Sequence, residues 1–285
     1  MATDIAGPRV RHPVASGSFY PRSPAALRAS VDALLAAAES SGQRSLTRPH
    51  SLRGVVVPHA GYEYSGPIAA TAYALLADQG HRPSHVVIIG PSHFEALRGS
   101  AVPTHEAWLT PLGEVPIDER ARQTALARGA IADDRPHRSE HSIEVQLPFI
   151  GCVWPDTPVL PIAVGSVSPD AGAEMLAAIV PEDAMLVVSS DLSHYHDADT
   201  ADRLDARSAA AIEALDDTSL GPEQACGYDA LRVAIAWARS LGLQASLLDL
   251  RNSSDTGGDA ISVVGYGSFA LEGSAAGSRS PASAG

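Results

Sequence analysis

The sequence predicts a single α/β domain, an αβα sandwich in which helices cover both faces of a mainly parallel or mixed central sheet. Short runs of Val, Ile and Leu alternate along the chain with longer segments of helical periodicity. Such alternation is typical of strands that are joined by helical crossovers and therefore run parallel. No interior linker rich in Pro, Gly or Ser divides the series, so the 285 residues are expected to form one large domain.

The predicted strands are short apolar runs that end at polar residues, Gly or Pro. Their central residues are mostly β-branched or Leu, as in RGVVV and HVVIIG, so both faces of each strand are expected to be buried. The predicted strands span residues 53–57, 85–90, 159–164, 185–190, 245–250 and 261–270.

The predicted helices lie between these strands and have apolar residues at a spacing of three or four. Pro67 lies near the first position of one of them, as is common at helix starts. Ser139 is expected to cap another, with Glu140 and Glu144 in its first turn. The predicted helices span residues 24–39, 66–79, 117–128, 140–149, 169–179, 199–215 and 228–241.

The two ends differ in composition from the rest of the chain. Residues 1–12 are expected to form an N-terminal arm, and residues 273–285 (GSAAGSRSPASAG) a disordered tail because they are small and polar. The α/β domain is therefore assigned to residues 13–272.

Composition excludes several classes of function. The formal net charge is −13, so neither nucleic acid nor an anionic membrane surface is an expected partner. All 20 basic residues are arginine, which excludes a Schiff-base or P-loop lysine. The sequence has no signal-peptide core and no apolar stretch of the ~18 residues that a membrane span needs. Two cysteines are expected to be reduced thiols in the cytoplasm.

Histidines follow three of the predicted strands at the point where each strand ends. His59 follows the first, His93 the second, and Asp191, His194 and His196 follow a third. In open α/β sheets the carboxyl ends of the strands meet at one edge, where ligands bind. One such histidine is more often a structural residue, but three at the same edge predict a functional site with metal-binding or acid–base chemistry.

Cys226 is a candidate for a third metal ligand. It precedes a strongly helical run, and a helix N-terminus favours the thiolate form. Two histidines and a thiolate suit iron, copper or zinc rather than magnesium or calcium. For Cys226 taken alone, structural burial is slightly favoured over metal binding, and burial is also the expected role of Cys152 among bulky apolar residues.

Other residues near the strand ends have two possible roles each. Asp191 could hold the ring of His194 in one tautomer or could simply stabilise a turn. His141 could line the pocket or belong to the helix expected at residues 140–149. The aromatic residues beside the histidines could form a substrate wall or pack in the interior: Tyr62, Tyr64, Phe94 and Tyr195.

Five ordered motifs resemble a known family. PHAGYEYSG, GPSH, EHSIEVQLPF, SSDLSHY and ACGYDAL, preceded by VASGSFYP, resemble the Memo family. In bacteria and archaea this family includes AmmeMemoRadiSam system protein B. The resemblance covers roughly residues 9 to 272, and its specificity comes from five motifs in order rather than from any one of them.

The resemblance implies a fold similar to that of class III extradiol dioxygenases, whose iron is held by two histidines and a carboxylate. Carried over motif by motif, it implies that His59, His93 and Cys226 bind iron or copper, with zinc less expected. It also implies that His194 is the acid/base residue, with Asp191 beside it. A cysteine in place of the carboxylate means that ring cleavage does not follow from the fold.

These observations lead to three hypotheses. The first is a redox metalloprotein with a dioxygenase-like site, acting with radical-SAM and AMMECR-like partners in an AmmeMemoRadiSam modification system. The second is a non-catalytic adaptor that binds a small molecule or a peptide in the same pocket. The third is a metal-assisted hydrolase. A serine hydrolase is not expected because no G-x-S-x-G motif follows a strand.

Overall fold

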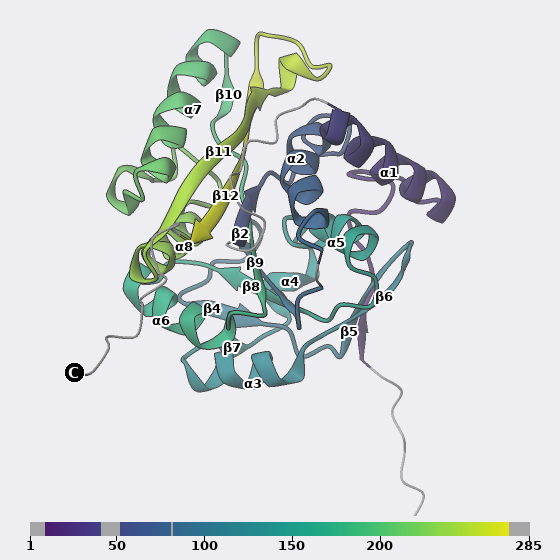
Figure 1. Ribbon diagram of the computed structural model, residues 1–285, viewed down its shortest axis with the longest axis vertical. Coiled ribbons are helices and arrows are strands. Elements are labelled where there is room, and N and C mark those ends of the chain that lie inside the picture. Colours follow the sequence, from purple (N-terminus) through teal and green to yellow (C-terminus); the bar gives the residue numbers. More distant parts are fainter. Residues whose placement is uncertain (1–8, 41–51, 81, 274–285) are drawn as a thin grey trace, which may run out of the picture.

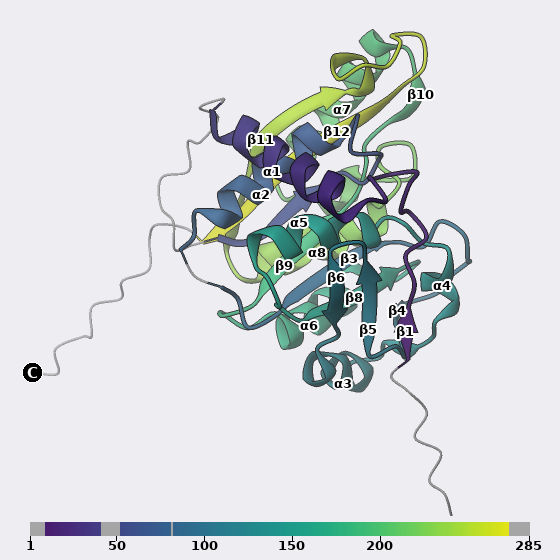
Figure 2. The same cartoon turned by 90° about the vertical axis from the view of Figure 1, so that its right-hand side faces the viewer.

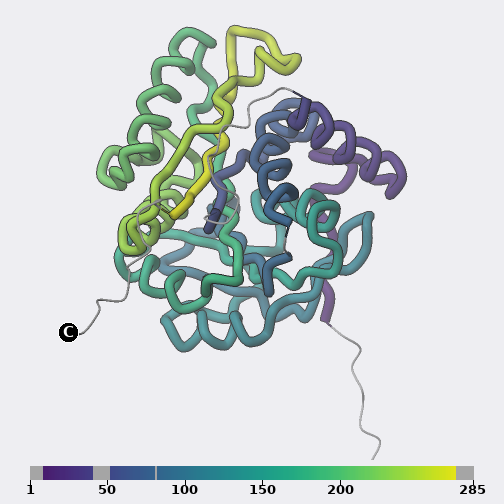
Figure 3. The backbone as a smooth tube through the Cα atoms, in the orientation of Figure 1, coloured from purple at the N-terminus to yellow at the C-terminus, as the bar shows by residue number. Residues whose placement is uncertain are grey.

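The computed structural model describes residues 9–40, 52–80 and 82–273, arranged as a mixed sheet with helices on both faces (Figure 1). The α/β sandwich expected from the sequence is confirmed. Figure 3 traces the chain from its purple N-terminal part to the yellow β11–β12 pair. Of the expected arm, residues 1–8 lie outside the described residues, and of the expected tail only Gly273 is described.

Four parallel strands form the centre of the sheet. β2 pairs with β9, β9 with β3, and β3 with β8, all in parallel. β12 runs antiparallel to β2 on one side, and β4 runs antiparallel to β8 on the other, so the sheet is mixed. Across the described part of the sheet the order is β10 (His194–His196), β12 (Val263–Gly273), β2 (Leu52–Val57), β9 (Met185–Ser189), β3 (Val86–Pro91), β8 (Val159–Val164), β4 (Ser100–Val102) and β7 (Ile131–Ala132), with β11 (Leu243–Asn252) paired to β12.

Helices cover the sheet on both faces, as Figures 1 and 2 show from two directions. α1, α2 and α5 pack against one another, and α2 lies against β2 and β12. α6 packs against α8 and α3, and α8 lies against β3 and β9. The α-helices are α1 (Pro24–Ser40), α2 (Gly66–Ala77), α3 (Glu119–Ala127), α4 (Arg135–Arg138), α5 (Leu147–Val153), α6 (Pro169–Ile179), α7 (Ala198–Glu213) and α8 (Tyr228–Ser240).

The core lies between the central strands and these helices. Every residue of β3, β8 and β9 is buried, as expected for parallel strands that are covered on both faces. α6 and α8 approach closely because Gly172 has no side chain. A Cβ atom there would lie 2.5 Å from a methyl carbon of Val233.

The segment between β3 and η1 (Glu144–Gln146) contains more structure than the sequence predicted. Besides β4, β7 and α4, it forms a small sheet in which β5 (Ala107–Thr110) pairs with β6 (Gly113–Pro116) and, in parallel, with β1 (Val10–Arg11). Part of the expected N-terminal arm is therefore a strand of a sheet (Figure 2).

The helix expected over residues 140–149 is not continuous. The chain forms turns at its start, the 3₁₀-helix η1, and only then α5. The side chains of Glu140 and Glu144 are fully buried and accept hydrogen bonds from other segments. Such bonds need a loop geometry that a regular helix would not provide. Two further 3₁₀-helices are η2 (Asp217–Ser219) and η3 (Ser253–Asp255).

None of the helices that the structure describes combines the length and the apolar character that crossing a membrane would require.

Candidate metal centre

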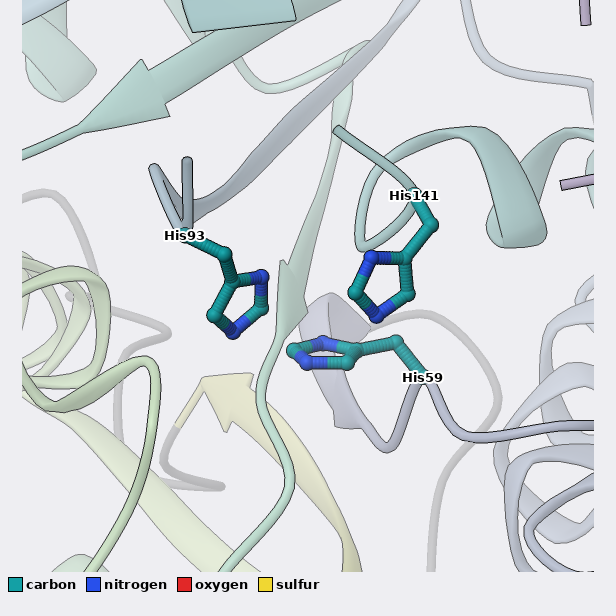
Figure 4. Close-up of side chains that lie close together, drawn as sticks. All are labelled: His59, His93 and His141. Atoms are coloured by element: carbon teal, nitrogen blue, oxygen red, sulfur yellow. The ribbon is translucent and has the colours of Figure 1, made fainter. Parts of the chain in front are cut away.

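Three histidines from separate loops meet at the carboxyl edge of the central sheet (Figure 4). His59 follows β2, His93 follows β3, and His141 lies in the turn before η1. One ring nitrogen of each lies within 4.8 Å of the other two. The centroids of the three rings are 5.1–5.5 Å apart. His59 and His93 were expected here because both follow the carboxyl ends of predicted strands, whereas His141 comes from a segment that was expected to be helical.

His59 is held in place by both its backbone and its ring. Its amide donates to the Asp191 carboxylate at 2.7 Å, and its Nδ1 lies 3.0 Å from the hydroxyl of Ser189. Burial, followed by the charge of nearby His93, lowers the pKa of His59 to about 3. The ring is therefore neutral at neutral pH, which is the form that binds metals.

His93 is held by a buried carboxylate. Glu140 accepts from Nδ1 of His93 at 2.9 Å and from its amide at 2.7 Å, as well as from the amides of His141 and Ser142. Burial alone would raise the pKa of Glu140, but its hydrogen bonds and the charge of His93 lower it to about 2. The sequence predicted Glu140 in the first turn of a helix, whereas its carboxylate binds His93 of the candidate metal centre.

His141 is held by ring contacts. Its ring stacks on His93 with an interplanar angle of 15°, and the Phe19 ring lies 4.3 Å from it between centroids. Burial, followed by the charge of His59, lowers the pKa of His141 to about 4. Phe19 was not singled out in the sequence, although VASGSFYP contributed to the family resemblance.

Cys226 lies beside the cluster, just before the first turn of α8. Its sulfur is 3.2 Å from Nε2 of His59 and 3.7 Å from the carbonyl oxygen of Asp191. Burial and the Asp191 carboxylate raise the pKa of the thiol, opposing the effect expected from the helix start. A bound cation would reverse this balance, because a thiol that coordinates a metal loses its proton.

The donor atoms of the cluster fit a metal ion. Nε2 of His93 has no hydrogen bond within the described part of the chain, and Nε2 of His59 has Cys226 as its only one. Imidazole and thiolate together are typical ligands of zinc, copper and iron.

Asp191 and His194 lie at the same site but not in the relationship expected from the sequence. Nδ1 of His194 is 2.8 Å from the carbonyl oxygen of Leu192, which fixes the ring. The Asp191 carboxylate is buried and holds the backbone of His59 instead. Burial raises the pKa of Asp191.

A cavity of about 530 Å³ gives access to the cluster. Tyr195 lies at its rim, 79% exposed and with a positive φ of 62°, a conformation that bulky residues rarely adopt. Pro222 and Glu223, which the sequence did not indicate, contribute to the wall. The cavity is lined by Phe19, His59, His93, His141, Asp191, His194, Tyr195, His196, Pro222, Glu223 and Cys226.

Three aromatic residues considered as a substrate wall do not line the cavity: Tyr62, Tyr64 and Phe94. Tyr62 is buried, donates its hydroxyl to the carbonyl of Val145 at 2.6 Å, and packs against Phe149. Tyr64 is also absent from the lining of the cavity. From the protein interior, Tyr62 thus stabilises the segment that carries His141.

A family profile described as Memo-like protein matches residues 11–270. The chain belongs to the Memo family. Relatives in the Memo family include a MEMO1 family protein of Methanothermobacter thermautotrophicus, which is 35% identical over an alignment of 275 residues, with 90% of this chain and 98% of the relative covered. A MEMO1 family protein of Thermotoga neapolitana is 36% identical over 279 residues, with 90% of this chain and 98% of the relative covered.

A solved structure shares the fold. An uncharacterized protein of Escherichia coli K12 superposes with a TM-score of 0.53 at 15% identity, covering 76% of this chain and 99% of the other. At that identity the likeness concerns the fold of this Memo family member and not its chemistry.

Proposed function

We propose that this Memo family protein is a redox-active metalloprotein that holds one iron or copper ion in a dioxygenase-like site. One observation carries the proposal: three imidazoles and a thiol, from four separate loops, converge on a cavity open to solvent. Structural burial explains one histidine easily, but it gives no reason for three rings to present their nitrogens to one another.

His59, His93 and Cys226 are the proposed ligands. Metal–nitrogen and metal–sulfur bonds of roughly 2.0 and 2.3 Å place two ligand atoms of a tetrahedral site about 3.5 Å apart. The 3.2 Å between Cys226 Sγ and His59 Nε2 is close to this spacing. His141 belongs to the same cluster and is proposed as a fourth ligand, which a substrate could displace.

Iron or copper would supply one-electron redox chemistry and a position for O₂ or a small ligand. The likeness of the family to extradiol dioxygenases favours these metals over zinc. His194 is the proposed proton carrier, because its Nδ1 bonds to Leu192 while its Nε2 has no partner among the described residues. Asp191 supports this role indirectly by fixing the loop of His59.

The proposed cellular role is in an AmmeMemoRadiSam modification system in the cytoplasm, with radical-SAM and AMMECR-like partner proteins. Family membership supports this role. Co-purification from the native organism tests it: recovery of neither partner would count against it.

A second candidate is a binding module that accepts a small molecule or peptide in the same cavity. Two exposed aromatic side chains beside the cluster favour it, since Tyr195 is 79% and Phe94 59% exposed. Aromatic rings at a surface are enriched where proteins bind ligands.

An anaerobic titration of metal-free protein with Fe²⁺, Cu²⁺ and Zn²⁺ tests the proposal, followed by measurement of O₂ uptake with catechols and thiols. We expect one ion per chain, and we expect iron or copper to bind more tightly than a weakly coordinating control ion such as Mg²⁺. Binding without O₂ uptake for any compound would favour the binding module. Failure to bind any of these ions would contradict both the metal and the redox assignments.

A further inference from the structure

We infer that hydrogen bonds behind the rings fix His59, His93 and His194 in one tautomer, with the proton on Nδ1, before any ion binds. Their Nε2 lone pairs then face the cavity without rearrangement. His141, the third member of the cluster, has no such partner among the described residues and can exchange its proton between the two nitrogens. Ser189 and Glu140 are thereby assigned as positioning residues.

The tautomer of His59 follows from the partners of Ser189. The Ser189 hydroxyl has one proton, and it lies 2.6 Å from the carbonyl oxygen of Ser142, which can only accept. The hydroxyl proton therefore points to Ser142. Ser189 Oγ, 3.0 Å from Nδ1 of His59, must accept, so Nδ1 carries the proton.

The side-chain amide of Gln146 does not offer the Ser189 hydroxyl another acceptor. Gln146 Nε2 lies 2.9 Å from the carbonyl oxygen of Pro58, so this end of the side chain is the NH₂ group. The same group lies 3.0 Å from Ser189 Oγ and donates to it, while the Tyr73 hydroxyl donates to Gln146 Oε1. Ser189 Oγ thus accepts hydrogen bonds from both Gln146 and His59.

The tautomer of His93 follows from Glu140. The side chain of Glu140 is fully buried and accepts from the Nδ1 of His93 and from three backbone amides, those of His93, His141 and Ser142. An ionised carboxylate only accepts, so Nδ1 of His93 is the donor. His194 follows the same rule, because the partner of its Nδ1 is the carbonyl of Leu192.

His141 is different although it lies in the same cluster. Its ring nitrogens make no hydrogen bond within the described residues, and its Nδ1 is 3.5 Å from Glu140 Oε1, longer than a normal hydrogen bond. Phe19 and His93 hold the ring by its faces, which fixes its plane but not its proton. His141 is therefore the ring of the cluster that can change between ligand and proton carrier.

Outer partners of this kind orient a ligand and raise its basicity, and their loss weakens metal binding by roughly 10–100-fold. Ser189 and Glu140 act through different rings from different segments, so each is expected to affect its own histidine. Only this consequence for metal binding rests on the proposed function; the tautomers are a property of the metal-free protein.

Nitrogen-15 NMR of the histidine rings in metal-free protein tests the tautomers directly and needs no variant to fold. We expect His59, His93 and His194 with the proton on Nδ1, and His141 as a mixture. Nε2-protonated His59 or His93 would overturn the inference, and so would a single fixed tautomer of His141.

Ser189→Ala and Glu140→Gln extend the test to the two positioning residues. We expect Ser189→Ala to shift His59 alone, and Glu140→Gln to shift His93, each with a roughly 10–100-fold weaker affinity for the metal. Ser268→Ala is the matched control, since Ser268 of β12 is equally buried and its hydroxyl pairs with Thr71 of α2, away from the histidines. Asp249→Asn, a buried carboxylate paired with Arg251, is the control for Glu140.

The outcomes separate the two claims. Fixed tautomers in a protein that binds no metal would contradict the proposed function and leave this inference standing. Metal binding with freely exchanging tautomers at His59 and His93, or equal affinities in the Ser189→Ala and Ser268→Ala variants, would overturn this inference alone.

Discussion

The sulfur of Cys226 lies 3.2 Å from Nε2 of His59, although 167 residues separate them in the sequence. His59 lies in the loop after β2, and Cys226 lies just before α8, which packs against the neighbouring strands β3 and β9. The contact joins a thiol to a neutral imidazole at the edge where α/β proteins bind ligands.

His59→Ala and His93→Ala are expected to abolish stoichiometric metal binding. Each removes a ligand rather than an outer partner, so the loss of affinity should exceed the roughly 10–100-fold that outer partners contribute. Equilibrium dialysis against metal buffers measures it. His12→Ala is the control because His12 is exposed outside the cavity. An equal loss in the control would show that the metal binds elsewhere.

Cys226→Ser is expected to change the absorption spectrum and the metal preference of the site more than its metal content. The three histidines remain, but the charge-transfer absorption of a metal–thiolate bond should disappear and affinity for soft ions such as Cu⁺ should fall. Cys152→Ser should change neither, since Cys152 lies in α5 and not in the cavity wall. An unchanged absorption spectrum in Cys226→Ser would remove the thiolate from the ligand set.

Glu144→Ala is expected to destabilise the fold by about 3–5 kcal/mol, because it leaves the buried Arg11 guanidinium unpaired. The fully buried Glu144 carboxylate accepts from Arg11 at 2.6 Å, from the Tyr20 hydroxyl at 2.7 Å, and from the amides of Val14 and Ala15. Urea unfolding measures the change. A loss below about 1 kcal/mol, as for an exposed pair, would mean that this network does not fasten the N-terminal segment.

Removing both charges should cost less than removing one. Arg11→Met combined with Glu144→Met leaves no buried ion without a partner, so part of the stability should return. If the double variant is as unstable as the sum of its single variants, the two side chains do not interact energetically.

The stability of the protein should fall as the pH decreases from about 6.5 towards 4. Burial, together with the Arg11 guanidinium, lowers the pKa of His137 to about 4, against roughly 6.5 in an unfolded chain. The unfolded state therefore binds more protons in this window, at up to about 1.36 kcal/mol per pH unit for each such histidine.

His137→Gln should reduce this slope, as measured by urea unfolding at several pH values. The variant keeps a donor for the Ala101 carbonyl, which lies 3.1 Å from Nε2 of His137, but it cannot titrate. His59 and His141, whose pKa values are also lowered, should retain the rest of the slope. A slope as steep as that of the unmodified protein would count against His137.

The sequence predicted the fold and the positions of His59 and His93 for a physical reason. Buried parallel strands are recognisable as apolar runs, and their carboxyl ends share one edge, so residues that follow them must converge. The same rule could not distinguish β12 as antiparallel, because a run such as SVVGYGSF carries no information on the direction of its partner.

The roles of Glu140 and Glu144 could not be predicted. Both lie at a spacing that suits the first turn of a helix, and helix starts favour acidic residues. Their actual partners, His93 and Arg11, come from distant segments, so only the tertiary structure reveals them. Tyr62 is the opposite case, since proximity in sequence to His59 suggested a pocket residue, whereas its ring packs inward.

Elemental analysis combined with electron paramagnetic resonance tests the proposed metal site most directly, on protein purified without oxygen and on its His59→Ala variant. We expect about one iron or copper ion per chain in the unmodified protein and very little in the variant. Equal metal contents in the two proteins, or an unmodified protein with neither iron nor copper, would rule out the proposed site.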